Sequence, residues 1–169
     1  AIHILEAYKR IVPEAKFYQA SSSEMFGLSV DDDGFQRETT SMNPVSPYGC
    51  SKVFAYNMVR HYRRAHGLHA VNGILFNHES PIRGKEFVTR KITDGVAKIK
   101  LGLQDKIVLG NLDAKRDWGF AGDFVEAMWL ILQQEKPEDF VLATGITTTI
   151  RDFVKMSFAE LGIELGFKG

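Results

Sequence analysis

Short apolar segments alternate with longer amphipathic segments along nearly the whole chain. The strand candidates are residues 16–21, 69–76, 106–110, 116–118 and 138–144, and the helix candidates are residues 1–12, 47–66, 87–103, 122–135 and 149–162. Parallel strands need long crossover connections, which are usually helices, so this order is typical of a parallel sheet. The sequence therefore predicts an α/β layered domain with crossover helices.

Composition narrows the class of protein further. The 169 residues are 44% apolar, enough for one core, and carry 21 basic and 21 acidic side chains. The balanced charge argues against a general field for nucleic acid or an anionic membrane, although a local basic pocket stays open. A single cysteine, Cys50, excludes an internal disulfide framework and favours a reducing compartment. With no apolar run near 18 residues, we predict a soluble, cytoplasmic protein without metal.

Two segments carry expectations of their own. Residues 22–46 contain glycines, a run of three aspartates and a proline, so they are predicted to form a long loop, and such loops are commonly functional. Residues 122–135 are apolar on almost every side, which predicts a buried helix.

Polar clusters follow the predicted strands where ligands of open α/β sheets gather, outside the carboxyl ends. They are SSSE at 21–24, NHESP at 77–81 and the surroundings of Arg116. The helix that begins at Pro47, with Ser46 as its N-cap, should start at the same edge. Each cluster taken alone is equally consistent with a solvated turn.

One stripe of the helix at 47–66 carries a tyrosine and a lysine above apolar residues. The stripe consists of Tyr48, Lys52, Ala55, Val59 and Tyr62, spaced by four and three residues. A lysine here either finds a partner on the inward face or extends outward to water. Turned inward, its ammonium would lie one turn from the Tyr48 hydroxyl, an arrangement suited to general acid/base work.

Tyr48-x-x-x-Lys52, with the Ser22 hydroxyl after the preceding strand, resembles the catalytic set of the extended short-chain dehydrogenase/reductases. The ordered motifs SSSEMFG, SPYGCSK, NGILFNHESP, FVTRKI, LGNLDAKRDWGF and EDFVLATG resemble one family among them, the GDP-mannose 4,6-dehydratases. The resemblance covers essentially the whole chain. It implies a partial, doubly wound, Rossmann-like sheet with NADP as cofactor and GDP-mannose as substrate. Residues 1–76 would hold the cofactor-binding half and residues 77–169 a mixed substrate region.

The resemblance also implies roles for particular residues. Those expected in catalysis are Ser22, Glu24, Tyr48 and Lys52; those expected at the cofactor are Tyr48, Lys52, Ser21 and Arg83; those expected at the substrate are Asn77, Val88, Lys91 and Arg116. Tyr48 would take the proton of the sugar 4-hydroxyl, and Glu24 the proton at C5. Arg116 would hold the diphosphate, which suits the fixed fork of its guanidinium. His78 and Glu79 are expected to support the site rather than to react.

Glu24 distinguishes a GDP-mannose dehydratase from the alternative functions. A sugar epimerase needs the serine and the Tyr–Lys pair but no carboxylate at C5. Two residues after Ser22, Glu24 would point to the same side if the segment were extended. Dehydratases acting on dTDP-glucose typically have an Asp-Glu pair here, whereas Ser23 precedes Glu24 in this chain. Another epimerase or dehydratase, and a non-catalytic nucleotide-sugar binding protein, remain as alternatives.

The glycine-rich strand–turn–helix with which the family opens has no counterpart in the sequence. The first residues already look helical, and the chain stops soon after its last helix. We therefore expect a fragment of a longer dehydratase that binds NADP poorly and is inactive alone. The resemblance implies a homodimer or homotetramer for the full-length protein, with the helices at 47–66 and 87–103 as candidate packing surfaces.

Overall fold

The computed structural model describes residues 1–168, and the chain divides into two compact units. One unit contains Ala1–His78 and Ala121–Ala143, and the other contains Glu79–Phe120 and the chain from Thr144 onward. We expected a division after residue 76. The segment 121–143, far along the chain, belongs with the first unit.

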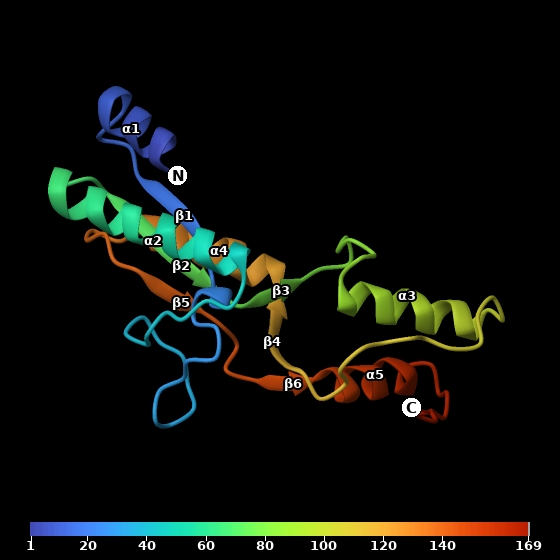
Figure 1. Cartoon of the computed structure of the whole chain (residues 1–169). Coiled ribbons are helices and arrows are strands. Elements are labelled where there is room, and N and C mark those ends of the chain that lie inside the picture. The colour runs from blue at the N-terminus through green and yellow to red at the C-terminus, as the bar shows by residue number, and fades with distance from the viewer. Residues whose placement is uncertain (169) are drawn as a thin grey trace. The chain divides into compact units, whose positions relative to one another are not determined.

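The first unit is built on a parallel sheet with strand order β1-β2-β5 (Figure 1). Its strands are β1 (Phe17–Ser22), β2 (Ala70–Leu75) and β5 (Phe140–Leu142). Phe17 pairs with Ala70 and Ser22 with Leu75, so β1 and β2 end at the same edge. Every residue of the central strand β2 is buried, as its apolar sequence predicts.

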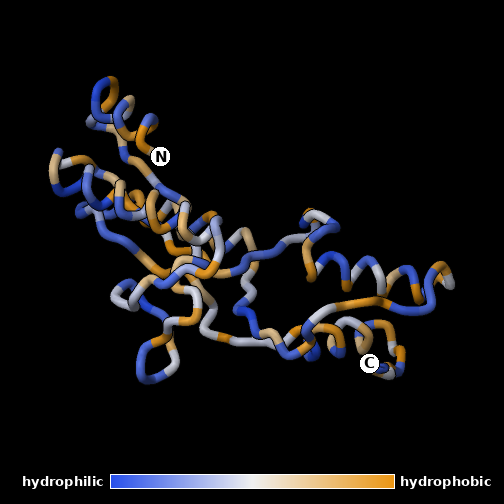
Figure 2. Tube along the Cα trace, viewed as in Figure 1, coloured by the Kyte–Doolittle hydropathy of each residue, from blue (hydrophilic) through white to orange (hydrophobic). Residues whose placement is uncertain are grey.

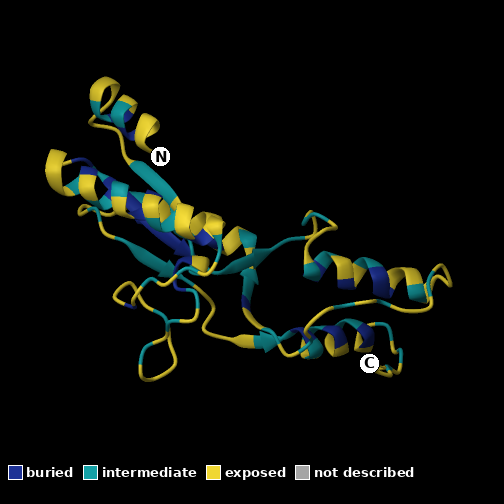
Figure 3. Ribbon diagram, viewed as in Figure 1, coloured by how far each residue is buried: buried dark blue, intermediate teal, exposed yellow. Residues whose placement is uncertain are grey.

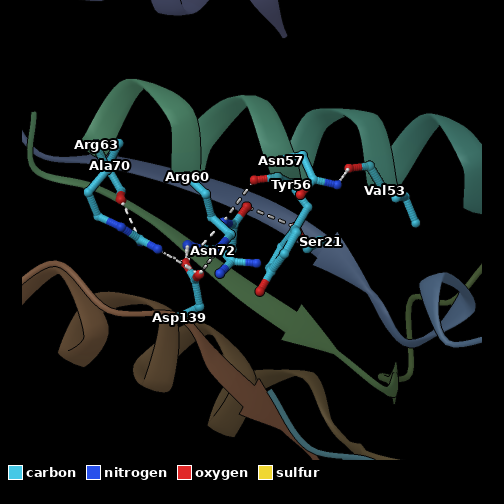
Figure 4. Close-up of polar contacts among 9 residues, drawn as sticks. All are labelled: Ser21, Val53, Tyr56, Asn57, Arg60, Arg63, Ala70, Asn72 and Asp139. Carbon is cyan, nitrogen blue, oxygen red and sulfur yellow. Dashed lines mark hydrogen bonds and ion pairs between the residues drawn. The ribbon is translucent and has the colours of Figure 1, made fainter. Parts of the chain in front are cut away.

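Helices cover both faces of this sheet, and the parallel α/β prediction is thereby confirmed. They are α1 (Ile2–Ile11), α2 (Pro47–His66) and α4 (Ala121–Gln133). α2 and α4 lie on opposite sides of the strands (Figures 1 and 4). Val59 and Tyr62 of α2 pack with α1 and Ala70, and Tyr56 packs with Ile74. The even-numbered residues of β2 therefore face α2.

The expectation that the helix at 122–135 is buried all round is wrong. Of its residues only Phe124 and Ile131 are buried, whereas Val125, Trp129 and Leu130 are exposed. One side of α4 packs on the sheet, and the opposite side of the helix is open in this structure. The alternation of buried and exposed faces along the helices is visible in Figure 3.

The second unit is smaller and contains an antiparallel pair of strands. Its elements are α3 (Val88–Lys100), β4 (Lys115–Phe120), β6 (Thr147–Thr149) and α5 (Ile150–Ala159). β4 and β6 pair antiparallel, with Arg116 opposite Thr148. Ile92 and Val96 of α3 form the core with Val154 and Phe158 of α5. The sequence pattern predicted the helices and part of β4, but neither β6 nor the antiparallel pairing.

Residues 106–110 form no strand, although their sequence predicts one. This apolar segment runs between α3 and α5 (Figures 1 and 2), where Ile107 and Leu109 pack against the core of the second unit. Its apolar side chains are thus covered by helices without any strand pairing. The predicted polar cluster at 77–81 contains the three-residue strand β3 (Asn77–Glu79), which lies where the chain passes from one unit to the other.

Candidate active site

Ser22 is the last residue of β1 and at the same time the N-cap of a short 3-10 helix, η1 (Ser23–Met25). Its backbone is extended (φ −146°, ψ 144°), and its Oγ accepts a hydrogen bond of 3.2 Å from the backbone N–H of Glu24. The chain therefore turns at the carboxyl edge of the sheet immediately after the serine. Glu24 is exposed within this turn.

The helical conformation of residues 23–25 contradicts one prediction from the sequence. We expected Ser22 and Glu24 to point to one side because an extended segment alternates its side chains. Residues 23–25 are instead helical, so that alternation does not apply. Both side chains still belong to the same short turn at the end of β1, and the expected role of Glu24 stays a prediction.

The first turn of α2 begins where the sequence predicts. The Ser46 Oγ accepts a hydrogen bond of 3.0 Å from the Gly49 N–H, and Pro47 occupies the first helical position. A Cβ added to Gly49 would lie 2.8 Å from the Glu24 carbonyl oxygen. Only a glycine therefore lets the start of α2 approach η1 this closely. The close approach brings the Glu24 turn and the Tyr48 turn together.

Lys52 joins the same helix to β1. Its ammonium Nζ donates a hydrogen bond of 2.8 Å to the Ala20 carbonyl oxygen and lies 5.4 Å from the centre of the Tyr48 ring. Tyr48 is 54% exposed, so its ring is open to a ligand at this edge. The lower stripe residues Ala55 and Val59 are buried, as expected. Lys52 is partly buried and bonds to the strand, and this contact is itself exposed to solvent.

Ser21 lies beside these residues but points into the protein. It is buried, and its Oγ donates a hydrogen bond of 3.1 Å to the Asn72 Oδ1. The hydroxyl is thus engaged in an internal contact, and the expected contact of Ser21 with a cofactor stays a prediction. Asn77, at the start of β3, is partly exposed. The preceding Phe76 N–H donates to the Leu142 carbonyl oxygen at 2.9 Å, which places Asn77 at the carboxyl end of the sheet.

Polar contacts hold the loop between Glu24 and Tyr48, first within the loop and then to the sheet. Arg37 pairs with Asp31 at 2.9 Å and with Asp33 at 2.6 Å. Further along, the Glu38 Oε1 accepts a hydrogen bond of 2.6 Å from the backbone N–H of Val141 in β5. The long predicted loop is therefore anchored to the same sheet that carries Ser22.

The remaining predicted residues lie in the second unit. Val88 begins α3, Lys91 is exposed one turn later, and Arg116 is exposed on β4. Lys91 borders a hollow of about 420 Å³ that Lys85, Lys98 and Lys106 also line. Asp94 belongs to the same lining and pairs with Lys98 at 2.7 Å and with Lys85 at 3.5 Å, so the lysine charge there is partly neutralised. The contacts with substrate expected of Val88, Lys91 and Arg116 stay predictions.

Arg83 is held by neighbours of its own unit. Its Nε lies 3.1 Å from the Glu79 Oε2, and its guanidinium lies 3.5 Å from the centre of the Phe87 ring. The same carboxylate oxygen of Glu79 accepts a hydrogen bond of 2.8 Å from the Thr89 hydroxyl. Glu79 thereby fixes the entry to α3.

The His78 ring stacks on Phe124 in the first unit, with 4.8 Å between ring centres.

Sequence reasoning missed a buried polar network beneath α2. Asn72 is fully buried in the central strand and contacts Ser21 and Asp139, and Asp139 pairs with Arg63 (Figure 4). The signal was present in the sequence, because an asparagine interrupts the apolar run AVNGIL. A buried amide needs hydrogen-bond partners, so this position should have been read as part of a network.

Two absences concern the described part of the chain. Residues 1–168 contain no group of three or more His, Cys, Asp or Glu side chains arranged to hold a metal ion. No helix among these residues is long and apolar enough to cross a membrane.

A parallel sheet covered by helices on both faces, with a Tyr–Lys pair at its carboxyl edge, defines a Rossmann-like α/β protein of the short-chain dehydrogenase/reductase type. The chain belongs to the GDP-mannose 4,6 dehydratase family, whose model matches residues 1–169. It is 52% identical to the GDP-mannose 4,6-dehydratase of Yersinia enterocolitica and 53% identical to that of Homo sapiens, each over 170 aligned residues. Each match covers 99% of this chain but only 45% of the relative, so the chain spans less than half the length of these curated relatives.

Solved structures share the fold. The structure of RMD from Pseudomonas aeruginosa, complexed with NADPH, matches with a TM-score of 0.89 at 23% identity. The match covers 98% of this chain and 56% of that one. A dTDP-glucose 4,6-dehydratase from Bacillus anthracis in complex with NAD matches with a TM-score of 0.84 at 25% identity, over 95% of this chain and 50% of that one.

Proposed function

We propose that the full-length protein containing these residues dehydrates GDP-mannose to GDP-4-keto-6-deoxymannose by internal hydride transfer through NADP. The observation that carries the proposal is the meeting of two turns at one sheet edge. The Glu24 turn follows β1, and the Tyr48 turn lies against it through Gly49. The family match and the 52% identity to a named dehydratase support the same substrate.

The residues at this edge fit a nicotinamide cofactor. Tyr48 is 54% exposed, and Lys52 is fixed beside it by its bond to the Ala20 carbonyl oxygen. Lys52 has further N–H donors for a ribose hydroxyl. When bound, NADP would accept hydride from C4 of the sugar and return it to C6. The structural relatives complexed with NADPH and with NAD support this class of cofactor, and the family resemblance favours NADP.

The chain's own residues would carry the proton transfers. Tyr48 takes the proton of the sugar 4-hydroxyl as general base, while the Ser22 hydroxyl hydrogen-bonds the same oxygen. The resulting 4-keto group acidifies the proton at C5, which Glu24 removes. Glu24 then returns its proton to the 6-hydroxyl, which leaves as water, and Tyr48 gives the proton it took to C5 when C6 receives the hydride. These steps need Glu24 to be accessible, and it is exposed in this structure.

Substrate binding is assigned to the second group of predicted residues. Asn77 would contact the substrate phosphate and sugar, Val88 and Lys91 the guanine, and Arg116 the diphosphate. Arg116 is exposed, and its Nη1 donates to the Lys115 carbonyl oxygen at 2.7 Å, which leaves most of its N–H donors for phosphate oxygens. Arg83 is assigned to NADP.

We further infer that the 169 residues do not turn over GDP-mannose by themselves. They span 45% of the length of named relatives, and their sequence holds no glycine-rich turn for the cofactor pyrophosphate. The single exposed Cys50 agrees with a reducing, cytoplasmic location. We assign the full-length protein as a homodimer or homotetramer, as the family resemblance implies.

The test is product formation from GDP-mannose with added NADP, followed by nuclear magnetic resonance of the sugar. The full-length protein should yield the 4-keto-6-deoxy sugar, whereas the 169-residue chain at equal concentration should yield none. A 4-epimer as the product would replace the proposal with the epimerase alternative. Turnover by the 169-residue chain would contradict the inferred inactivity.

A further inference from the structure

A connected set of polar side chains lies between α2 and the sheet (Figure 4). At its centre is Asn72, whose side chain is fully buried in β2. Its Nδ2 donates to the Asp139 Oδ1 at 3.0 Å and to the Tyr56 carbonyl oxygen of α2 at 3.4 Å. Its Oδ1 accepts the hydrogen bond from Ser21 of β1. One amide thus contacts α2, β1 and the residue that precedes β5.

Asp139 and Arg63 form an ion pair at the end of this set that lies away from Ser21. Both carboxylate oxygens of Asp139 face the guanidinium of Arg63, with Nη1–Oδ1 and Nη2–Oδ2 distances of 2.7 Å. The Arg63 Nη1 also donates to the Ala70 carbonyl oxygen at 2.9 Å. The Asp139 side chain is only 9% exposed and that of Arg63 15%. Such a two-pronged pair restricts orientation as well as distance.

The near end of the set lies beside the catalytic residues. Ser21 stands between Ala20, whose carbonyl oxygen holds Lys52, and Ser22, which caps the Glu24 turn. α2 is therefore bonded to the strands near its start through Lys52 and in its second half through Arg63. Apolar packing alone is non-directional, whereas these hydrogen bonds fix one rotation of the helix about its axis.

We propose that Asn72 and Arg63, joined through Asp139, are positioning residues that set the rotation of α2 and thereby hold Tyr48 and Lys52 against the end of β1. The proposal rests on the proposed function, because it gives the network a role in that reaction. Asn72 lies on a buried strand and Arg63 lies four turns along α2 from Tyr48, so neither is expected to touch the substrate. A misplacement of about 1 Å at a reacting group can lower turnover about 100-fold.

The test compares two network variants with a matched control in the full-length protein. Asn72→Ala removes the central amide. Arg63→Lys is milder, since it keeps the charge but loses the two parallel N–H donors. The control is Arg64→Lys, the same chemical change at the exposed neighbouring position of the same helix. Each protein is studied below its unfolding temperature, with hydrogen exchange of residues 47–56 and steady-state kcat and KM for GDP-mannose.

The network variants should show faster hydrogen exchange in residues 47–56 and a kcat lowered about 10-fold to 100-fold, with KM for GDP-mannose changed less than about threefold. Arg64→Lys should match wild type in both. If Asn72→Ala does not fold, the results for Arg63→Lys test the positioning role. A folded variant with wild-type kcat, or with exchange indistinguishable from the control, would overturn the positioning role. Wild-type protein that forms no 4-keto-6-deoxy sugar would instead overturn the proposed function.

Discussion

Lys52 reaches from the second turn of α2 to the carbonyl oxygen of Ala20 in β1, with 2.8 Å between Nζ and oxygen. This bond ties the helix that carries Tyr48 to the strand that ends in Ser22. The contact is exposed to solvent, and its acceptor is a backbone group beside the candidate catalytic residues. The same contact fixes Lys52 one helical turn from Tyr48, with its Nζ 5.4 Å from the centre of the Tyr48 ring.

Replacement of Tyr48 by phenylalanine should lower kcat without lowering stability. The ring stays, but the hydroxyl that we propose as general base is lost, so we expect a decrease of about 100-fold to 10,000-fold in the full-length protein. Tyr48 is 54% exposed, and its hydroxyl makes no hydrogen bond within residues 1–168, so the unfolding temperature should change little. Cys50→Ser, at a nearby exposed position, is the control and should keep wild-type kcat. Undiminished turnover of Tyr48→Phe would refute its role as base.

Replacement of Glu24 by glutamine should stop the reaction after oxidation at C4. The amide cannot remove the C5 proton, so exchange of that proton with deuterated water should fall at least about 100-fold along with product formation. The exposed position of Glu24 predicts a stability close to wild type. Mass spectrometry of recovered substrate and product measures the exchange. C5 exchange at the wild-type rate would assign the base to another residue.

Replacement of Gly27 by alanine should damage the loop between Glu24 and Tyr48. Gly27 has a φ of +60°, and a Cβ there would lie 1.8 Å from the Asn43 carbonyl oxygen, so strain and overlap add. We expect a loss of about 3 kcal/mol in the free energy of unfolding. Gly34 is the matched control: its φ is +83°, but an added Cβ meets nothing within 4 Å.

Gly34→Ala should therefore cost only about 1 kcal/mol, the strain of the left-handed backbone. Urea unfolding of the two variants in the full-length protein measures the difference. Equal losses for Gly27→Ala and Gly34→Ala would show that the contact with Asn43 does not constrain the loop.

Asp139 should make stability depend on pH in the acid range. Burial raises its pKa, but hydrogen bonds from Arg63 and Asn72 and the Arg63 charge outweigh burial, and the net pKa is lowered. Arg60, 3.9 Å away, adds a second positive charge, and Tyr56 lies nearby. A carboxylate whose pKa is lowered in the folded state stabilises the protein at pH values above its pKa in the unfolded chain, about 3.9. That contribution is lost as the pH falls through the lower pKa of the folded state.

The free energy of unfolding of wild type should therefore exceed that of Asp139→Ala by about 3 kcal/mol at pH 7, because the variant leaves Arg63 partly buried without its partner. Below about pH 4 the difference should begin to shrink, because the unfolded chain takes up a proton at Asp139 before the folded protein does. Urea unfolding at pH 7, 5 and 3.5 checks this. A difference that stays constant over this range would contradict the lowered pKa.

Helices and strands were predictable from sequence where a regular apolar pattern ends at residues that start or stop the element. α2 begins at Pro47 and ends at His66 as expected, because Ser46 caps its start and Gly67, with φ +65°, ends it. β2 was predictable because its apolar run is buried on both faces. The approach of the Tyr48 turn to the Glu24 turn was expected, because the helix that begins at Pro47 should start at the edge where the parallel strands end.

The errors arose where tertiary packing overrides a local pattern. Residues 106–110 have a strand-like sequence, but Ile107 and Leu109 are covered by two helices without strand pairing. The Glu24 turn is helical because the Ser22 hydroxyl caps it, which a count of alternating residues cannot reveal. The partners of Asn72 lie 51 and 67 positions away in sequence, so a single sequence shows the need for partners but not their identity.

The most direct test of the proposed site follows one hydrogen isotope through the reaction. The full-length protein is incubated with NADP and GDP-mannose that carries deuterium at C4, and the product is examined by nuclear magnetic resonance. If Tyr48 and Glu24 act as proposed, the deuterium moves to C6 of the 4-keto-6-deoxy sugar, and Glu24→Gln abolishes this transfer. Deuterium found at C4 of an epimerised sugar, or lost to water, would contradict the account.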